Sequence, residues 1–178
     1  IEDDDEEIND DYAMVSSTDT TPPPDYDFDL FVQKEGYFYG SKSISSKDST
    51  KNNKLDIKLE KVEKGKKFRM DNILFETDSF NLSNNSKKEL TILSDFLNLN
   101  RNLKIGIYGH TDNQGSFSKN LILSDKRAQA VKNMLIEMGI NKNRLLHKGF
   151  GSRKSIASNK TEQGRKMNRR TEIEILEN

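Results

Sequence analysis

The chain of 178 residues contains no cysteine, only three prolines and no long hydrophobic run. Without cysteine, neither disulfides nor cysteine-ligated metal sites can form, although both reducing and oxidising compartments remain compatible with the sequence. No apolar stretch approaches the roughly 20 residues that a membrane-spanning helix needs. The chain starts at Ile1 and runs directly into acidic residues, so the sequence predicts no signal peptide, and the start without Met predicts a fragment or a processed chain.

Basic residues are also absent from the beginning of the chain. Residues 1–33 hold 12 of the 29 acidic residues and no Lys or Arg, so the remainder carries 29 bases against 17 acids. The net charge of zero therefore hides an acidic tail that precedes a basic domain. Because the basic residues are interleaved with acids and no RNA-binding aromatic signature is present, we predict no nucleic-acid partner.

The composition changes twice along the chain. Residues 1–26 are acidic, then rich in Ser and Thr, and end near three consecutive prolines, which predicts a disordered tail or linker. An acidic patch that docks on a basic partner is the alternative for this segment. Residues 27–64 predict a short β segment, interpreted as the remnant of an upstream β domain. In that segment, strands near 28–32 and 55–59 flank a loop over 41–54 that is rich in Ser, Lys and Asn.

From residue 65 to 178 the hydrophobic pattern becomes regular and predicts one folded domain. Ser86 to Glu89 reads as a capping box that starts a helix. Alternating apolar residues in two of the expected strands indicate that one face of the sheet packs on the core and the other is exposed to solvent. The sequence therefore predicts an α+β fold: a two-layer sandwich with a βαβαβ-type mixed sheet of about four strands and helices on one face. The expected strands are 68–75, 103–108, 145–150 and 171–177, and the other expected helices are 118–138 and 161–169.

The run from Gly109 to Arg127 carries the residues of greatest chemical interest. Asp112 lies just past a predicted strand, and Arg127 follows on a predicted helix, with hydrogen-bonding side chains between them. A fixed anion and a fixed cation around a polar cleft suit a ligand that carries both an ammonium and a carboxylate. By spacing alone, a structural salt bridge that ties the loop to the helix is an equal alternative.

Catalytic and metal sites are weakly represented. His110 stands beside Thr111 and Asp112, but adjacent residues at a strand end point in different directions and form no relay. Two histidines without cysteine, without an HxxxH motif and without a calcium-loop pattern leave no recognisable ligand set. The sequence thus predicts a protein that is not an enzyme and that has no metal and no cofactor.

Several ordered motifs resemble the OmpA-like peptidoglycan-binding domain, a family that includes Pal lipoproteins and the stator protein MotB. They are GHTDxxG from Gly109, NxxLSxxRAxxV from Asn120, GFG from Gly149 and NxTxxGRxxNRR from Asn159. The segment ILFETDS from Ile73 looks like the first strand of that domain. The resemblance covers roughly residues 65–176.

The resemblance implies non-covalent binding of peptidoglycan through the diaminopimelate of its stem peptide. Asp112 would hold the ammonium and Arg127 the carboxylate. The other positions that match the family's pocket are Thr111, Asn120, Asp78, Leu123, Ser124 and Asn168.

The resemblance also implies a place in the cell. The domain would be the C-terminal part of a larger outer-membrane protein, on the periplasmic face, and would anchor the outer membrane or an envelope protein to the cell wall. The outer membrane would be reached through the missing upstream part. The sequence leaves open whether the domain forms a homodimer, and it leaves a protein–protein interaction module of the envelope as the alternative function.

Overall fold

A computed structural model of the chain describes residues 12–16, 27–45, 54–70, 73, 75, 80 and 82–178. The chain divides into two compact units, Ile1–Val62 and Glu63–Asn178. The limit predicted between residues 64 and 65 lies two residues from this division. Within the described ranges, no helix is both long enough and apolar enough to cross a membrane.

The first unit consists of two antiparallel strand pairs. Strand β2 (Asp27–Val32) pairs with β3 (Gly40–Ser45), and β1 (Tyr12–Ser16) pairs with β4 (Lys54–Lys58). A small apolar cluster forms where the pattern of alternation predicts buried residues. Its members are Val32, Ile57 and Leu59, with Leu30 and Tyr37 packed against them.

Two segments of this unit differ from the expectation. The loop predicted over 41–54 is wrong in its first part, because residues 40–45 form β3. The backbone hydrogen bonds to β2 hold these residues in a strand. The sequence did not predict this strand, because it is rich in Ser and shows little alternation of apolar and polar residues. Within the predicted tail, residues 12–16 form β1, a short apolar run (YAMVS) that the acidic composition of its surroundings concealed. The other residues of that tail lie outside the described residues.

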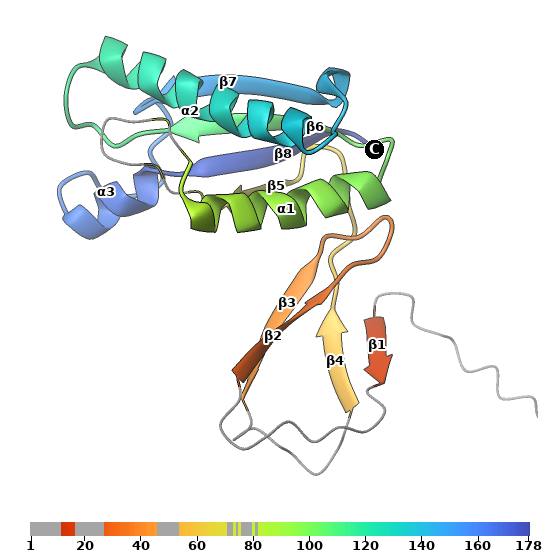
Figure 1. Ribbon diagram of the computed structural model, residues 1–178. Helices are drawn as coiled ribbons and strands as arrows, with labels where there is room; N and C mark the ends of the chain where they lie inside the picture. The colour runs from red at the N-terminus through yellow and green to blue at the C-terminus, as the bar shows by residue number, and fades with distance from the viewer. Residues whose placement is uncertain are drawn as a thin grey trace, which may run out of the picture. The chain divides into compact units, whose positions relative to one another are not determined.

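The second unit is built on a four-stranded mixed sheet with the order β5-β8-β6-β7. Strands β6 (Lys104–His110) and β7 (Leu145–Gly151) are parallel, and β8 (Thr171–Glu177) lies antiparallel between β6 and β5 (Lys67–Met70). Helices α1 (Asn84–Leu99) and α2 (Phe117–Glu137) cover one face of the sheet (Figure 1). The predicted α+β two-layer fold is therefore confirmed.

The core lies between this sheet face and the two helices, because each contributes one apolar surface. The inward residues of β8 alternate with Glu172 and Glu174 on the opposite face, where Lys67 forms an ion pair of 3.3 Å with Glu174. The buried core residues include Leu90, Leu93, Phe96 and Leu97 of α1, Ala128, Val131 and Leu135 of α2, and Ile105, Ile107, Leu145, Ile173 and Ile175 of the sheet.

Both long helices of this unit begin and end at capping residues, and α1 begins at a different cap from the predicted one. Helix α1 starts three residues earlier than predicted, because Ser83 rather than Ser86 is the N-cap and its Oγ accepts the Ser86 backbone N–H at 3.2 Å. Ser86 is buried inside the first turn. Helix α2 ends at Glu137, one residue before the predicted Met138, and Met138 is its C-cap. Gly139 follows as the predicted stop, with a φ of 94° that favours glycine and lets the Ile140 N–H donate to the Leu135 carbonyl.

Two smaller elements complete this unit. A 3-10 turn (Lys142–Arg144) precedes β7, and helix α3 (Glu162–Asn168) lies between β7 and β8 with Thr161 as its N-cap. The strand predicted over 68–75 is shorter than expected, because β5 ends at Met70 and Phe75 forms an isolated bridge with Leu82.

Arg144 ties the end of α1 to the sheet. Its guanidinium donates to the carbonyls of Leu97 and Asn100 at the C-terminus of α1 and to the carbonyl of Leu103 just before β6, all within 2.7–2.8 Å. These bonds satisfy carbonyls that a helix end leaves without an intrahelical partner. Burial lowers the pKa of Arg144 below its usual value, so the contacts offset a desolvation cost.

His110 is a buried side chain at the end of β6. Its ring stacks on Phe150 at 5.3 Å between centroids, and neither ring nitrogen has a well-aligned hydrogen bond to a described residue, although Nε2 lies 3.4 Å from Glu172 Oε2. Burial, together with the nearby Arg170, lowers the pKa of His110 to about 4. The imidazole is therefore neutral at pH 7.

Replacing Arg144 by Ala should lower the free energy of unfolding by about 2–3 kcal/mol, because three carbonyls lose a charged donor. Urea unfolding followed by circular dichroism measures the change. Arg101→Ala is the matched control, since Arg101 is an exposed arginine in the same loop region. An equal loss of unfolding free energy in the two variants would contradict the stabilising role of the Arg144 hydrogen bonds.

The stability of the domain should depend on pH through His110. Its folded pKa lies below the unfolded value of 6.5, so the unfolded state binds more protons between about pH 4 and 6.5. Stability should therefore fall as the pH falls through this window, by about 2 kcal/mol between pH 7 and 4.5. In His110→Phe, which keeps a ring for stacking, this part of the slope should vanish. A His147→Gln control should retain it, and equal slopes in all three proteins would refute the assignment.

Candidate functional site

Helix α2 approaches the carboxyl ends of β6 and β7 very closely. A Cβ atom at Gly109 would collide with the backbone carbonyl of Ser124, and one at Gly149 would collide with the backbone of Asp125. Two hydrogen bonds join α2 to β7. The Gly151 N–H donates to Ser124 Oγ at 2.8 Å, and the Gly149 N–H donates to Asp125 Oδ1 at 2.9 Å. This approach places the first half of α2 directly beside the strand ends.

A cleft of about 480 Å³ opens at this end of the sheet. Four parts of the chain contribute to its lining. They are Ile73 and Phe75 between β5 and α1, the end of β6 with the loop that follows, the first half of α2, and the segment from α3 into β8. The end of β6, the start of α2 and α3 lie at the same end of the domain (Figure 1). Its lining residues are Ile73, Phe75, Gly109, His110, Thr111, Asp112, Gln114, Asn120, Leu123, Arg127, Lys166, Arg169, Arg170 and Thr171.

Among the described residues of this lining, Asp112 is the acidic side chain. Its Oδ1 accepts the Gln114 N–H at 3.0 Å, and its Oδ2 forms an ion pair of 2.6 Å with Arg169, while only 10% of the side chain is exposed. The second terminal nitrogen of Arg169, Nη2, donates to Glu162 Oε1 at 2.7 Å. The hydrogen bonds to the carboxylates of Asp112 and Glu162 raise the pKa of Arg169. The carboxylate of Asp112 is therefore held in one orientation and partly neutralised.

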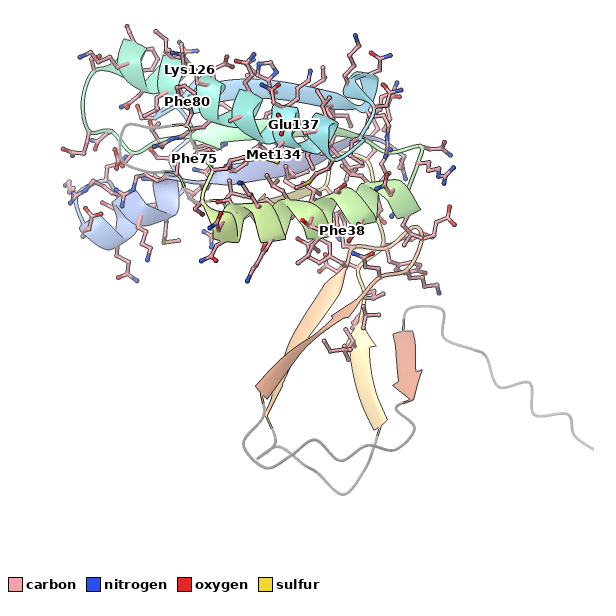
Figure 2. All side chains as sticks on the ribbon, in the orientation of Figure 1. Phe38, Phe75, Phe80, Lys126, Met134 and Glu137 are labelled. Atoms are coloured by element: carbon pink, nitrogen blue, oxygen red, sulfur yellow. The ribbon has the colours of Figure 1, made fainter. Side chains whose placement is uncertain are left out.

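Arg127 enters the cleft from α2. Its guanidinium carbon lies 5.0 Å from the ring centroid of Phe75, a cation–π distance, and Phe75 is labelled in Figure 2. Among the ion pairs of the described residues, Asp112 is joined to Arg169 and not to Arg127. The alternative of a direct salt bridge between Asp112 and Arg127 is therefore not observed.

Five of the eight predicted site residues line the cleft: Thr111, Asp112, Asn120, Leu123 and Arg127. Thr111 and Asn120 also stabilise the loop that carries Asp112. Thr111 Oγ1 donates to the Asp112 carbonyl at 2.8 Å, and Asn120 Nδ2 donates to the Gln114 carbonyl at 2.8 Å. Both are buried, so their amide and hydroxyl groups fix the loop from inside.

The remaining three predicted residues are placed differently. Ser124 and Asn168 are fully buried and their polar atoms are used internally. Ser124 Oγ donates to Leu121 and accepts from Gly151, and Asn168 bridges the backbone of Ile156 and Ala157. They support the walls of the cleft without lining it. Asp78 lies outside the described residues.

The pairing of Arg169 with Asp112 was not predicted. The two partners are 57 residues apart, so no local spacing in the sequence links them. Phe75, Gln114 and Lys166 were not singled out either. Among the described residues, no group of three His, Asp or Glu side chains is placed to hold a metal ion.

Comparison with known proteins gives related sequences for the part of the chain that contains the cleft. Residues 74–169 match the OmpA family. The peptidoglycan-associated lipoprotein of Buchnera aphidicola is 32% identical over 139 residues, which is 76% of this chain and 78% of that protein. Outer membrane porin F of Pseudomonas aeruginosa is 34% identical over 104 residues, 58% of this chain and 30% of the porin.

Solved structures share the fold. The cell wall anchor of the T6SS from Pseudomonas aeruginosa aligns with a TM-score of 0.55 and 27% identity, over 63% of this chain and 80% of the anchor. The periplasmic domain of Helicobacter pylori MotB (residues 90–256) aligns with a TM-score of 0.56 and 27% identity, over 65% and 76% of the two chains.

The related proteins differ in length from this chain. It spans about a third of some curated relatives, 30% of porin F and 35% of outer membrane protein A from Bordetella avium, but most of the Buchnera lipoprotein. The matched residues include both β6 and α2, which carry Asp112 and Arg127. On this family match and the extended similarity to the lipoprotein, the chain belongs to the OmpA family.

Proposed function

We propose that the domain binds peptidoglycan non-covalently through the diaminopimelate of the stem peptide. The observation that carries this proposal is the shared cleft, in which Asp112 and Arg127 present opposite charges without an ion pair between them. The names of two relatives, a peptidoglycan-associated lipoprotein and a cell wall anchor, support a cell-wall ligand.

The two charges suit the two ends of an amino-acid group. The ammonium of diaminopimelate pairs with the carboxylate of Asp112, which is already oriented by the Gln114 N–H. The carboxylate accepts two parallel hydrogen bonds from the planar guanidinium of Arg127, which the ring of Phe75 supports from one side. A ligand with only one of these groups satisfies only one half of the cleft.

We propose an anchoring role that follows from this binding. The domain would hold the outer membrane, or a larger envelope protein to which it is joined, against the cell wall from the periplasmic face. Binding of a repeating polymer suits such a tether, because many weak contacts along the wall add up through effective concentration. The role requires no bond-making chemistry in the cleft.

A protein–protein interaction module of the envelope is the alternative function. Such a module would use a surface other than the cleft. One such surface is a second hollow of about 480 Å³ beside α2, whose lining includes Phe80, Lys126, Met134 and Glu137 (Figure 2). Phe80 is 47% exposed there. Free diaminopimelate separates the two functions, since it competes for the cleft and leaves an interface on α2 unaffected.

Removing either charge should abolish binding to purified sacculi. Asp112→Asn keeps an acceptor for Gln114 but removes the anion, and Arg127→Gln removes the cation. Each should cost about 2–5 kcal/mol of binding, because the ligand's opposite charge is left unpaired. Pull-down with sacculi measures the loss, and circular dichroism checks that the fold is retained. Phe80→Ala is the matched control and should bind normally. Retained binding in both charge variants would rule out this site.

The cleft should also distinguish diaminopimelate from lysine. A lysine-containing stem peptide lacks the second carboxylate, so the wild-type domain should bind it at least tenfold more weakly. Titration calorimetry with the two peptides gives the ratio. Arg127→Gln should bind the diaminopimelate peptide no more tightly than the lysine peptide, since the group that binds the second carboxylate is gone. Equal affinities for the wild-type protein would disprove the role of Arg127.

A further inference from the structure

Phe75 supplies an aromatic ring to the wall of the cleft and is labelled in Figure 2. The guanidinium carbon of Arg127 lies over this ring, 5.0 Å from its centroid. At this distance the positive charge is attracted by the electron-rich face of the ring. Both side chains are half-buried, and an attraction of this kind is stronger where water is partly excluded. The ring therefore favours one position of the guanidinium among those that a long arginine side chain can reach.

The backbone fixes the place of Phe75 beside the start of α1. Phe75 forms an isolated antiparallel bridge with Leu82, which directly precedes Ser83, the N-cap of α1. Ile73 of the same segment is buried. The ring is thus carried by a segment that is joined to the start of α1, whereas Arg127 comes from α2. Their contact joins one wall of the cleft to the guanidinium that enters it from another.

An aromatic ring supports a guanidinium in a way that suits a binding site. A carboxylate in the place of the Phe75 ring would accept the N–H groups of Arg127 and neutralise its charge. The ring accepts no strong hydrogen bond, so its contact with Arg127 does not occupy the donors that an incoming carboxylate needs. Because a guanidinium binds a carboxylate through two parallel hydrogen bonds, its orientation decides how well the two groups match.

Orientation of Arg127 before binding also lowers the entropic cost of binding. A flexible side chain loses rotamer freedom when a ligand fixes it, and this loss subtracts from the affinity. Contact with Phe75 restricts Arg127 in the free protein, so less freedom is lost when a carboxylate binds. The benefit is confined to ligands with a carboxylate at Arg127. A ligand without that carboxylate does not use the oriented guanidinium.

We infer that Phe75 is a positioning residue that gives the cleft its preference for diaminopimelate over lysine. The inference rests on the proposed function and deepens it, because it assigns the choice between two stem peptides to a pair of side chains. Phe75 acts through Arg127 and not by a contact of its own with the ligand. The preference therefore depends on an aromatic ring at position 75 as well as on the cation at position 127.

Titration calorimetry with a diaminopimelate peptide and a lysine peptide tests this role. Phe75→Leu should bind the diaminopimelate peptide about two- to fivefold more weakly, the loss expected of one partly exposed cation–π contact. It should bind the lysine peptide as the wild type does, whereas a distorted cleft would weaken both peptides. Phe75→Met removes the ring with less change in volume and should give the same result. Phe75→Tyr keeps a ring and should keep the wild-type ratio.

Phe117→Leu is the matched control. The guanidinium carbon of Arg153 lies 4.7 Å from the centroid of the Phe117 ring, and neither residue belongs to the described lining of the cleft. This variant removes the same kind of contact elsewhere and should keep both affinities. A double-mutant cycle gives the second control. When Arg127→Gln is already present, adding Phe75→Leu should not change the affinity further, because the ring acts through the guanidinium.

Three results would overturn the role of Phe75. They are an unchanged affinity of Phe75→Leu and Phe75→Met for the diaminopimelate peptide, an equal loss for both peptides, and a further loss when Phe75→Leu is added to Arg127→Gln. A failure of the proposed function gives a different result, since the wild-type domain then binds neither peptide. In that case the inference falls with it.

Discussion

The close approach of α2 to the carboxyl ends of β6 and β7 is the constraint on which the site depends. Glycine at 109 and 149 is required because the helix backbone occupies the space of a side chain. Asp125 and Ser124 then satisfy strand N–H groups that would otherwise lack partners at this edge. The result is that a loop carboxylate and a helix guanidinium, 15 positions apart in sequence, line one cleft. A wider separation of helix and sheet would leave Asp112 and Arg127 on different surfaces.

Charge balance is the second organising principle. Asp112 lies in a mostly buried position where an isolated carboxylate would be costly, and Arg169 and the Gln114 N–H offset that cost. The same pairing limits how strongly the carboxylate can attract a simple cation. A ligand that carries both signs of charge suits this arrangement, because its anion can pair with an arginine of the cleft while its cation pairs with Asp112.

Much of the second unit could be predicted from the sequence, because its apolar residues recur with clear periods. The alternation in β8 and the stripe of Ala128, Val131 and Leu135 placed the sheet face and the helix that covers it. Capping was harder to predict, since Ser83 and Ser86 offer the same hydroxyl and only the helix start decides between them. In the first unit, β3 has little apolar alternation and forms through its pairing with β2.

The site was predictable only in part for a related reason. Local spacing brought attention to Asp112 and Arg127, but the partner of Asp112 comes from the far end of the chain and depends on how α3 meets β8. Nuclear magnetic resonance on the labelled domain titrated with diaminopimelate tests the proposed binding most directly. If diaminopimelate binds in the cleft, the signals of the Gln114 amide, the Asp112 carboxylate and the Arg127 guanidinium should shift together. Shifts confined to the exposed surface of α2, with these three unchanged, would contradict this binding.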